Sequence, residues 1–363
     1  MALDISPVTR RTGCPHPVDR QHTRKPILRA ARFAGAGAVL AAALLTGTLV
    51  GPAGLTPRSV LLELVGALPG VGVDSGLSSQ QQAILWQIRM PRVVLGALVG
   101  ATLAAAGAAY QGVFRNPLAD PYLLGVSSGA GLGATVAIVS GGSVGPVGIP
   151  LMAFAGGMLG VAATYALGST VTGSRSSVVI VLAGVAVAAF ANAAQTFVQQ
   201  RYDDSLLAVY AWMLGRLSTD GWSDVVAVLP YVTVACVAIL LHRRVLDVMA
   251  VGDVEAASLG VDPARVRLVL VLAATLGTAA VVSVSGLIGF VGIVVPHAIR
   301  LIFGASHRIL LPLALVLGAA FLVLTDVLAR WLLSPAELPI GVVTAMVGAP
   351  FFLVVLRRQR GAL

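Results

Sequence analysis

The chain has 363 residues, of which 57% are hydrophobic and 11% charged, and its mean hydropathy is +0.93. Soluble domains carry a charge at about a quarter of their positions, so this composition excludes a soluble protein and favours one that spans a membrane. The formal net charge is +9. No basic groove with interleaved aromatic residues accompanies that charge, which argues against a nucleic-acid partner.

The chain begins with a basic segment. Residues 1–25 are rich in Pro, Arg and Thr, and we expect residues 1–32 to form a disordered cytoplasmic tail. A cleaved signal peptide is the alternative interpretation. The long stretch before the first apolar segment, and the lack of a clear cleavage site after Leu49, favour an uncleaved first helix instead.

Apolar segments recur along the rest of the chain, and a spanning helix needs about 20 mostly apolar residues. We therefore expect an all-α, polytopic membrane domain over residues 33–357, with about ten transmembrane helices and a cytoplasmic C-terminus at 358–363. The candidate spans are residues 33–51, 90–112, 118–140, 149–170, 177–200, 225–243, 265–284, 286–304, 309–331 and 340–357. Only residues 284–286 separate the seventh from the eighth, so nine spans or a re-entrant hairpin is the alternative.

The basic residues predict the orientation, because loops on the cytoplasmic side are enriched in Lys and Arg. With ten helices and both termini in the cytoplasm, eighteen of the 24 Lys and Arg residues lie inside and six outside. The outer six are Arg58, Arg89, Arg92, Arg201, Arg216 and Arg330.

A polar turn separates the second candidate span from the third, within residues 111–130. Asn116 and Asp120 are each followed by proline, so each is interpreted as a helix N-cap with proline at the first helical position. Structured backbone near a membrane is tolerated where protein or a watery cavity shields it. The turn is therefore a candidate for the edge of a transport pathway.

Glycines four residues apart, as in Gly129/Gly133 and Gly156/Gly160, predict close helix packing in lipid. We expect this packing within one chain, with a homodimer seam as the alternative.

Few residues could power transport from within the membrane. Asp326 is the one acidic residue well inside a candidate span, and Arg330 follows one turn later. The pair stands near the outer end, where we expect it to be solvated, so ion coupling is disfavoured. Lys25 is the only lysine and belongs to no P-loop, so ATP would have to bind another subunit.

No pattern indicates a cofactor or a metal site. Cys14 and Cys236 lie in the tail and in a span, so we expect no disulfide, and the histidines lack the spacing of zinc ligands. The spans contain no nucleophile–base pair, so an enzyme embedded in the membrane is the least favoured class.

The longest cytoplasmic connection, residues 244–264, contains a short amphipathic pattern. Val254, Ala257, Ser258 and Val261 share one face of a helix that Asp253 can cap and Gly260 can terminate. Such a helix could present its face to the groove of a partner protein. A linker helix resting on lipid headgroups is the alternative.

Several sequence blocks occur in a fixed order. They are Arg89–Arg92, Gly100–Gly107, Gln111, Arg115–Pro121 and Leu124–Ala130, then Trp212–Arg216, Gly252–Asp262, Ser285–His297 with Arg300, Asp326–Arg330 and Glu337–Phe352. Together, over residues 84–357, they resemble the FecCD family, the membrane subunits of type II ABC importers for vitamin B12, haem and iron–siderophores.

The resemblance implies the transmembrane domain of a type II ABC importer, with ten helices per subunit. It implies a second permease subunit, identical or closely homologous, around a central pathway. It also implies two ABC ATPase subunits on the cytoplasmic side and an extracytoplasmic substrate-binding protein outside.

The resemblance also assigns roles to residues. Arg89, Arg92 and Arg330 would pair with glutamates of the binding protein. The alternatives are that Arg89 and Arg92 anchor a helix end among lipid headgroups, and that Arg330 pairs only with Asp326. Charged residues at the rim of an interface help to orient the partner protein as it docks.

On the cytoplasmic side, Asn116 and Leu118 resemble a gate that closes the pathway, and residues 172–177 resemble a second gate element. The segment that resembles a coupling helix in the ATPase groove contains Gly252, Asp253, Glu255, Ala256, Ala257, Leu259 and Gly260.

The sequence thus predicts the permease subunit of an ATP-driven importer that works by alternating access. An iron–siderophore is the first choice of cargo, with haem and vitamin B12 as alternatives. A carrier or channel that works alone is the competing hypothesis.

Overall fold

The computed structural model describes residues 21–51, 55–67, 70, 73–141, 147–170, 177–218, 221–334 and 336–360. Its internal contacts divide the chain into two units, residues 1–35 and residues 36–363. No strand occurs in these described ranges. The expected all-α class is therefore confirmed.

The first unit holds the start of helix α1 (Gln21–Leu49). That helix begins before residue 33, where the first span was predicted to start. Residues 1–20 lie outside the described residues, so the disordered tail stays a prediction.

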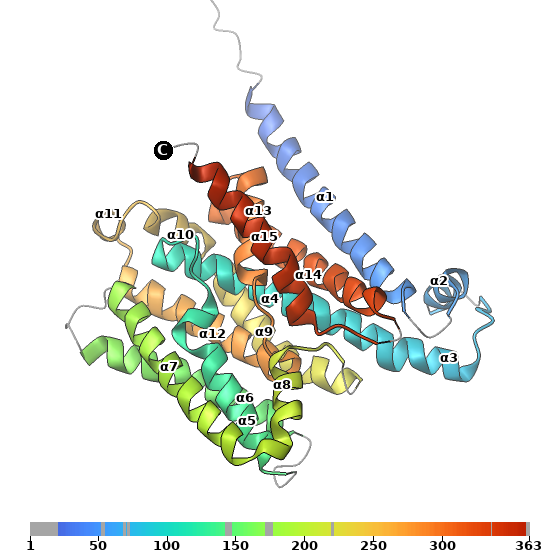
Figure 1. Ribbon diagram of the computed structural model, residues 1–363. Helices are drawn as coiled ribbons and strands as arrows, with labels where there is room; N and C mark the ends of the chain where they lie inside the picture. Colours follow the sequence, from blue (N-terminus) through green and yellow to red (C-terminus); the bar gives the residue numbers. More distant parts are fainter. Residues whose placement is uncertain are drawn as a thin grey trace, which may run out of the picture. The chain divides into compact units, whose positions relative to one another are not determined.

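The second unit holds the rest of α1 and all later helices (Figure 1). These are α2 (Pro57–Gly66), α3 (Ser79–Ala83), a π-helical stretch η1 (Ile84–Arg89), α4 (Met90–Phe114), a 3₁₀ turn η2 (Pro121–Leu124), α5 (Val126–Val139), α6 (Gly148–Thr170), α7 (Ser177–Arg201), a 3₁₀ turn η3 (Asp203–Ser205), α8 (Leu206–Met213), α9 (Trp222–Leu241), α10 (Arg243–Met249), α11 (Asp253–Ser258), α12 (Pro263–Ser285), α13 (Val291–Phe303), α14 (His307–Leu332) and α15 (Ile340–Arg360).

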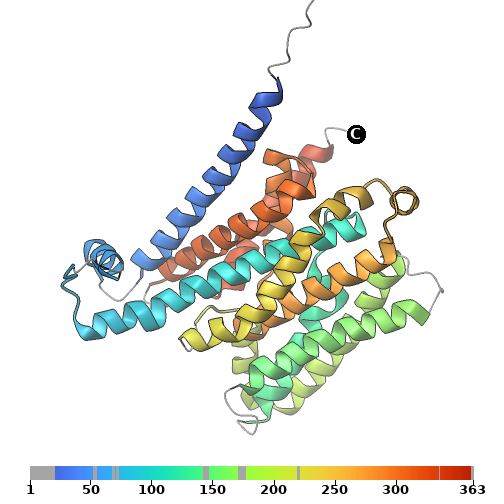
Figure 2. The same ribbon diagram turned by 180° about the vertical axis from the view of Figure 1, so that it is seen from behind.

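Helix α4 lies at the centre of the second unit. It packs against α9, α12, α13 and α14, and 78% of the most apolar part of the Ser79–Phe114 helix is buried. Helices α5, α6 and α7 pack against one another, and α12 contacts α5 and α6 as well as α4. Figures 1 and 2 show α12 running between these two groups of helices.

Glycine lets α5 and α6 approach closely. A Cβ atom added at Gly129 would collide with the carbonyl oxygen of Gly156, and one added at Gly133 would collide with that of Met152. Backbone contact of this kind needs residues without side chains. The expected packing within one chain is confirmed for these glycines.

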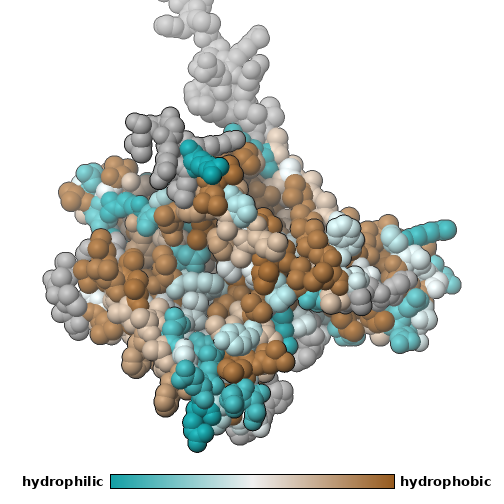
Figure 3. Space-filling model, viewed as in Figure 1, coloured by the Kyte–Doolittle hydropathy of each residue, from teal (hydrophilic) through white to brown (hydrophobic). Residues whose placement is uncertain are grey.

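Seven helices in the described part of the chain are long and apolar enough to cross a membrane. They are Ala30–Leu49, Ser79–Phe114, Gly148–Ser169, Val178–Arg201, Trp222–Leu241, Pro263–Ser285 and His307–Leu332. Three shorter apolar helices, Val126–Val139, Val291–Phe303 and Ile340–Val354, fall within the other three predicted spans. Figure 3 shows hydrophobic residues over much of the viewed face. The chain is a membrane protein, while a count of ten crossings stays a prediction.

The predicted span 118–140 is not one continuous helix. It consists of a turn, the 3₁₀ segment η2 and then α5, which begins after Gly125. Gly125 has a φ of 87°, a left-handed conformation that ends η2 and that glycine adopts without steric cost. An apolar pattern does not show such a break.

The backbone between α12 and α13 is irregular, and side chains from the polar turn hold it. The Tyr122 hydroxyl donates to the carbonyl oxygen of Ile288 (3.1 Å) and accepts from its amide (3.2 Å). Gln111 donates to the carbonyl oxygen of Gly292 (2.9 Å). Helix α13 has 13 residues, about 20 Å at 1.5 Å per residue, which is shorter than a hydrocarbon core of about 30 Å. The backbone groups of Ile288 and the carbonyl of Gly292 are thus satisfied from inside the protein.

Candidate functional site

Two of the three arginines predicted to dock a binding protein, Arg92 and Arg330, bind one carboxylate. Arg92 Nη2 lies 2.8 Å from Asp326 Oδ1, and Arg330 Nε lies 2.9 Å from Asp326 Oδ2. Asp326 is only 3% exposed, so its expected solvation is wrong. Two guanidinium groups replace the water that the buried carboxylate loses. We call Arg89, Arg92, Asp326 and Arg330 the arginine cluster.

Two members of the arginine cluster also bind the end of α1. Arg89 donates to the carbonyl oxygen of Thr48 (3.1 Å). Arg330 donates to the carbonyl oxygens of Val50 (2.8 Å) and Gly47 (3.2 Å). The last carbonyls of a helix lack partners within the helix and carry partial negative charge, so both arginines stabilise this end of α1.

Arg92 is the member that faces open space. It binds Glu337 (2.9 Å) as well as Asp326, and it lines a pocket of about 310 Å³ together with Glu337 and Arg216. Arg89 and Arg330 are each 5% exposed. Arg330 pairs with Asp326, but not with Asp326 alone, because it also binds the α1 carbonyls. Docking of a partner by the three arginines stays a prediction.

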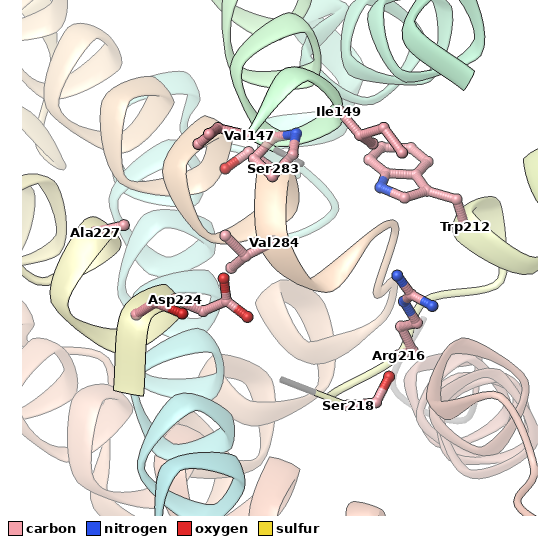
Figure 4. A pocket seen from close by; sticks show the side chains of 11 residues that line it. Val147, Ile149, Trp212, Arg216, Ser218, Asp224, Ala227, Ser283 and Val284 are labelled. Carbon is pink, nitrogen blue, oxygen red and sulfur yellow. The ribbon is translucent and has the colours of Figure 1, made fainter. Parts of the chain in front are cut away.

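A second pocket, of about 330 Å³, shares Arg216 with the first. Figure 4 shows Arg216 and Asp224 entering it from different walls, with Trp212 beside the arginine and Ser283 opposite. Arg216 has no predicted role. The signal that pointed to it was its place among the few basic residues predicted to lie outside.

The polar turn lies at the other end of α4, which spans 25 residues and therefore about 37 Å. The Asn116 side-chain oxygen accepts from the Leu118 amide (2.9 Å), and the Asn116 carbonyl accepts from Ala119 (3.0 Å). Asn116 therefore shapes a turn, and its predicted role as a helix N-cap is wrong. Asp120 does cap η2 by accepting from the Tyr122 amide (2.8 Å), as predicted.

The predicted gate residues Asn116 and Leu118 are both exposed, Leu118 to 45%. We call residues 115–119 the gate turn. The predicted second gate element lies at 172–177, and residues 171–176 are outside the described residues.

Helix α11 is the predicted coupling helix, and it ends as the sequence predicts. The Gly260 amide donates to the carbonyl of Ala257 (3.0 Å), and the Val261 amide donates to that of Ala256 (3.0 Å). With Gly260 at a φ of 81°, this is a Schellman motif. Ala256 is buried, whereas the other predicted contact residues outside the helix start are exposed: Glu255, Ala257, Leu259 and Gly260.

The start of α11 differs from the prediction. Gly252 is the N-cap residue and is buried, and Asp253 is the first helical residue. The Asp253 carboxylate does not cap the helix, because its two oxygens bind Arg115 (2.6 Å) and Arg267 (3.1 Å). This contact was not predicted, since nothing local to residues 244–264 indicates the approach of Arg115.

Within the described ranges, no three His, Cys, Asp or Glu side chains gather closely enough to hold a metal ion.

Comparison with known proteins gives a consistent result. Residues 39–358 match the model of the FecCD transport family. The chain is 40% identical, over 89% of its length and 95% of the relative, to the cobalamin import system permease protein BtuC of Halobacterium salinarum. It is 40% identical, over 76% of its length and 84% of the relative, to the hemin transport system permease protein HmuU of Yersinia pestis.

A solved structure shares the fold. It is described as a metal-chelate type ABC transporter in an inward-facing conformation, and it aligns with a TM-score of 0.77 at 28% identity. The alignment covers 89% of this chain and 98% of that chain.

Proposed function

Because the chain belongs to the FecCD transport family, we propose that it is the permease subunit of an ATP-driven importer that passes a metal chelate into the cytoplasm by alternating access. An iron–siderophore is our first choice of cargo, supported by the likeness to a metal-chelate type transporter. Haem and vitamin B12 are the alternatives, supported by the names of the hemin and cobalamin relatives.

We assign ATP hydrolysis to a partner ATPase subunit that binds α11. Three large apolar side chains on α11 or directly beside it are exposed to at least 70%: Val251, Val254 and Leu259. Beside them, α11 and the start of α12 border a pocket of about 450 Å³ that includes Val254 and Arg267. An exposed apolar ridge next to a hollow suits a protein groove better than water.

At the opposite end of α4, the proposal assigns docking of an extracytoplasmic binding protein to the arginine cluster. Arg92 supports this role because its side chain lines an open pocket. Glu337, its second partner, is 40% exposed and can be displaced by a carboxylate of the binding protein. Arg89 and Arg330 would act by holding the end of α1 and by keeping the local potential positive.

The proposal places the protein in the cytoplasmic (inner) cell membrane, with both termini in the cytoplasm and a second permease subunit beside it. The distribution of Lys and Arg supports this orientation. The arrangement of α4 supports it as well, since the gate turn and α11 meet at one end and the arginine cluster lies at the other.

The family match over residues 39–358 carries the proposal, and association with an ATPase tests it. Replacing Val254, which is 80% exposed, by Asp should abolish co-purification with the partner ATPase while leaving the permease folded, because a charge is placed on the apolar contact. Arg265→Ala, on the nearby exposed start of α12, is the control. Unchanged association of Val254→Asp would contradict the assignment of α11.

A further inference from the structure

The contact between the gate turn and α11 depends on one carboxylate. Asp253 Oδ1 binds Arg115 Nη2 (2.6 Å), and Asp253 Oδ2 binds Arg267 Nη2 (3.1 Å). Arg115 belongs to the gate turn, whereas Arg267 is buried in the long helix α12. One side chain at the start of α11 thus joins three separate segments.

The backbone of Arg115 is in a conformation that arginine rarely adopts. Its φ is 50° and its ψ is 35°, which is the left-handed region, and it is the C-cap residue of α4. Glycine is the usual residue at the left-handed end of a helix, because a Cβ atom is disfavoured there. An arginine in this position is a backbone outlier that the surrounding structure holds in place, which makes its side chain a candidate for a functional role.

The ion pair adds little to stability. The side chains of Arg115 and Asp253 are 40% and 43% exposed, and pairs exposed to this degree contribute weakly. Among the described residues, the guanidinium of Arg115 binds Asp253 alone. The contact therefore matters for where the gate turn lies relative to α11 rather than for holding the bundle together.

We propose that Asp253 is a positioning residue, which transmits movement of α11 to the gate turn through Arg115 and to α12 through Arg267. This inference rests on the proposed function, because it takes the ATPase as the source of that movement. When α11 shifts, Arg115 follows its charged partner, and the gate turn at Asn116 and Leu118 moves with it.

Hydrogen–deuterium exchange on the complete transporter, with its ATPase bound, tests the proposal without knowledge of the cargo. Exchange would be compared between nucleotide-free complex and complex trapped with ATP and vanadate. In the native complex we expect trapping to change exchange in both α11 and the gate turn. In Asp253→Asn and in Arg115→Gly, α11 should still respond, while the response of the gate turn falls about fivefold, the population change that roughly 1 kcal/mol gives.

Arg115→Gly separates positioning from local structure. Glycine adopts the left-handed backbone without steric cost. This variant should therefore keep or raise the melting temperature of the protein while it removes the ion pair. Asp253→Glu, which keeps the carboxylate, should retain the native response. Asp262→Asn should also retain it, because it removes a carboxylate from the separate pair with Arg265 (3.0 Å) on the same connection.

Two contrary results have different meanings. If α11 responds to nucleotide and the gate turn responds equally in native protein, Asp253→Asn and Arg115→Gly, the positioning role is wrong and the proposed function stands. If α11 of the native complex does not respond to nucleotide at all, the proposed function fails, and the positioning role fails with it.

Discussion

At the scale of single residues, Asp326 organises the end of the molecule that carries the arginine cluster. Its two carboxylate oxygens bind Arg92 and Arg330, and Arg330 in turn binds carbonyls at the end of α1. A buried ion pair is costly to break by removing one partner, because the other charge is left without compensation. The carboxylate therefore supports both the shape of this end and the orientation of Arg92.

Replacing Asp326 by Asn should lower the free energy of unfolding by roughly 3–5 kcal/mol, because Arg92 and Arg330 lose their shared buried counter-ion. Glu337→Gln is the matched control, since Glu337 also binds Arg92 but is 40% exposed, and it should cost under about 1 kcal/mol. Thermal unfolding of the purified protein in detergent measures both. Equal losses of unfolding free energy in the two variants would show that the burial of Asp326 does not determine the cost of replacing it.

Asp247 predicts a dependence of stability on pH. Burial opposes ionisation of this carboxyl, but hydrogen bonds from the His307 amide (2.6 Å) and the Ser306 hydroxyl (2.9 Å) hold the pKa of Asp247 below its usual range. The stabilisation is therefore complete above the unfolded pKa of about 3.9, and it is lost as pH falls through the lower folded value.

Asp247→Asn should remove this dependence. The difference in melting temperature between native protein and Asp247→Asn should shrink as the medium is acidified below about pH 4. Melting curves across this range provide the measurement. Parallel curves at all pH values would contradict a folded-state pKa below the usual range.

For Asp326 and Arg330, the sequence predicted the ion pair but not the burial of the two side chains. The spacing of Asp326 and Arg330, one helical turn apart, correctly indicated an ion pair. Their burial could not be predicted, because it depends on Arg92 and on the end of α1, which are distant in sequence. The contact of Asp253 with Arg115 was missed for the same reason.

At the scale of elements, local signals predicted helix ends where backbone geometry dictates the residue. Gly260 terminates α11 and Asp120 caps η2, as expected. The break at Gly125 and the short length of α13 were not predicted, because continuous apolar runs conceal a left-handed glycine or an irregular segment. Tertiary hydrogen bonds from Gln111 and Tyr122 make the irregular segment possible.

The contact between α5 and α6 gives a prediction at this scale. Gly129→Ala should lower the free energy of unfolding by about 1–3 kcal/mol, because its Cβ would collide with backbone of Gly156 that cannot move independently. Gly37→Ala in α1 is the control, since no atom lies within 4 Å of a Cβ added there. Unfolding of both variants in the same detergent is the test. A stable Gly129→Ala variant would show that the two helices can separate at little cost.

At the scale of the whole molecule, α4 links the two candidate surfaces of the second unit. It begins beside the arginine cluster and ends at the gate turn, which in turn contacts α11. Because α4 is buried among α9, α12, α13 and α14, it is suited to act as a rigid element about which the gate turn moves. The order of sequence blocks predicted a gate and a coupling segment on the cytoplasmic side through the family resemblance, but not the contact between them, whereas composition alone predicted only a helical membrane protein.

The most direct test of the account is uptake of a ferric siderophore into proteoliposomes with a defined set of components. We expect accumulation when the permease, its ATPase, ATP and the loaded binding protein are all present, and none when the ATPase is omitted. Accumulation against a gradient by the permease alone would contradict it.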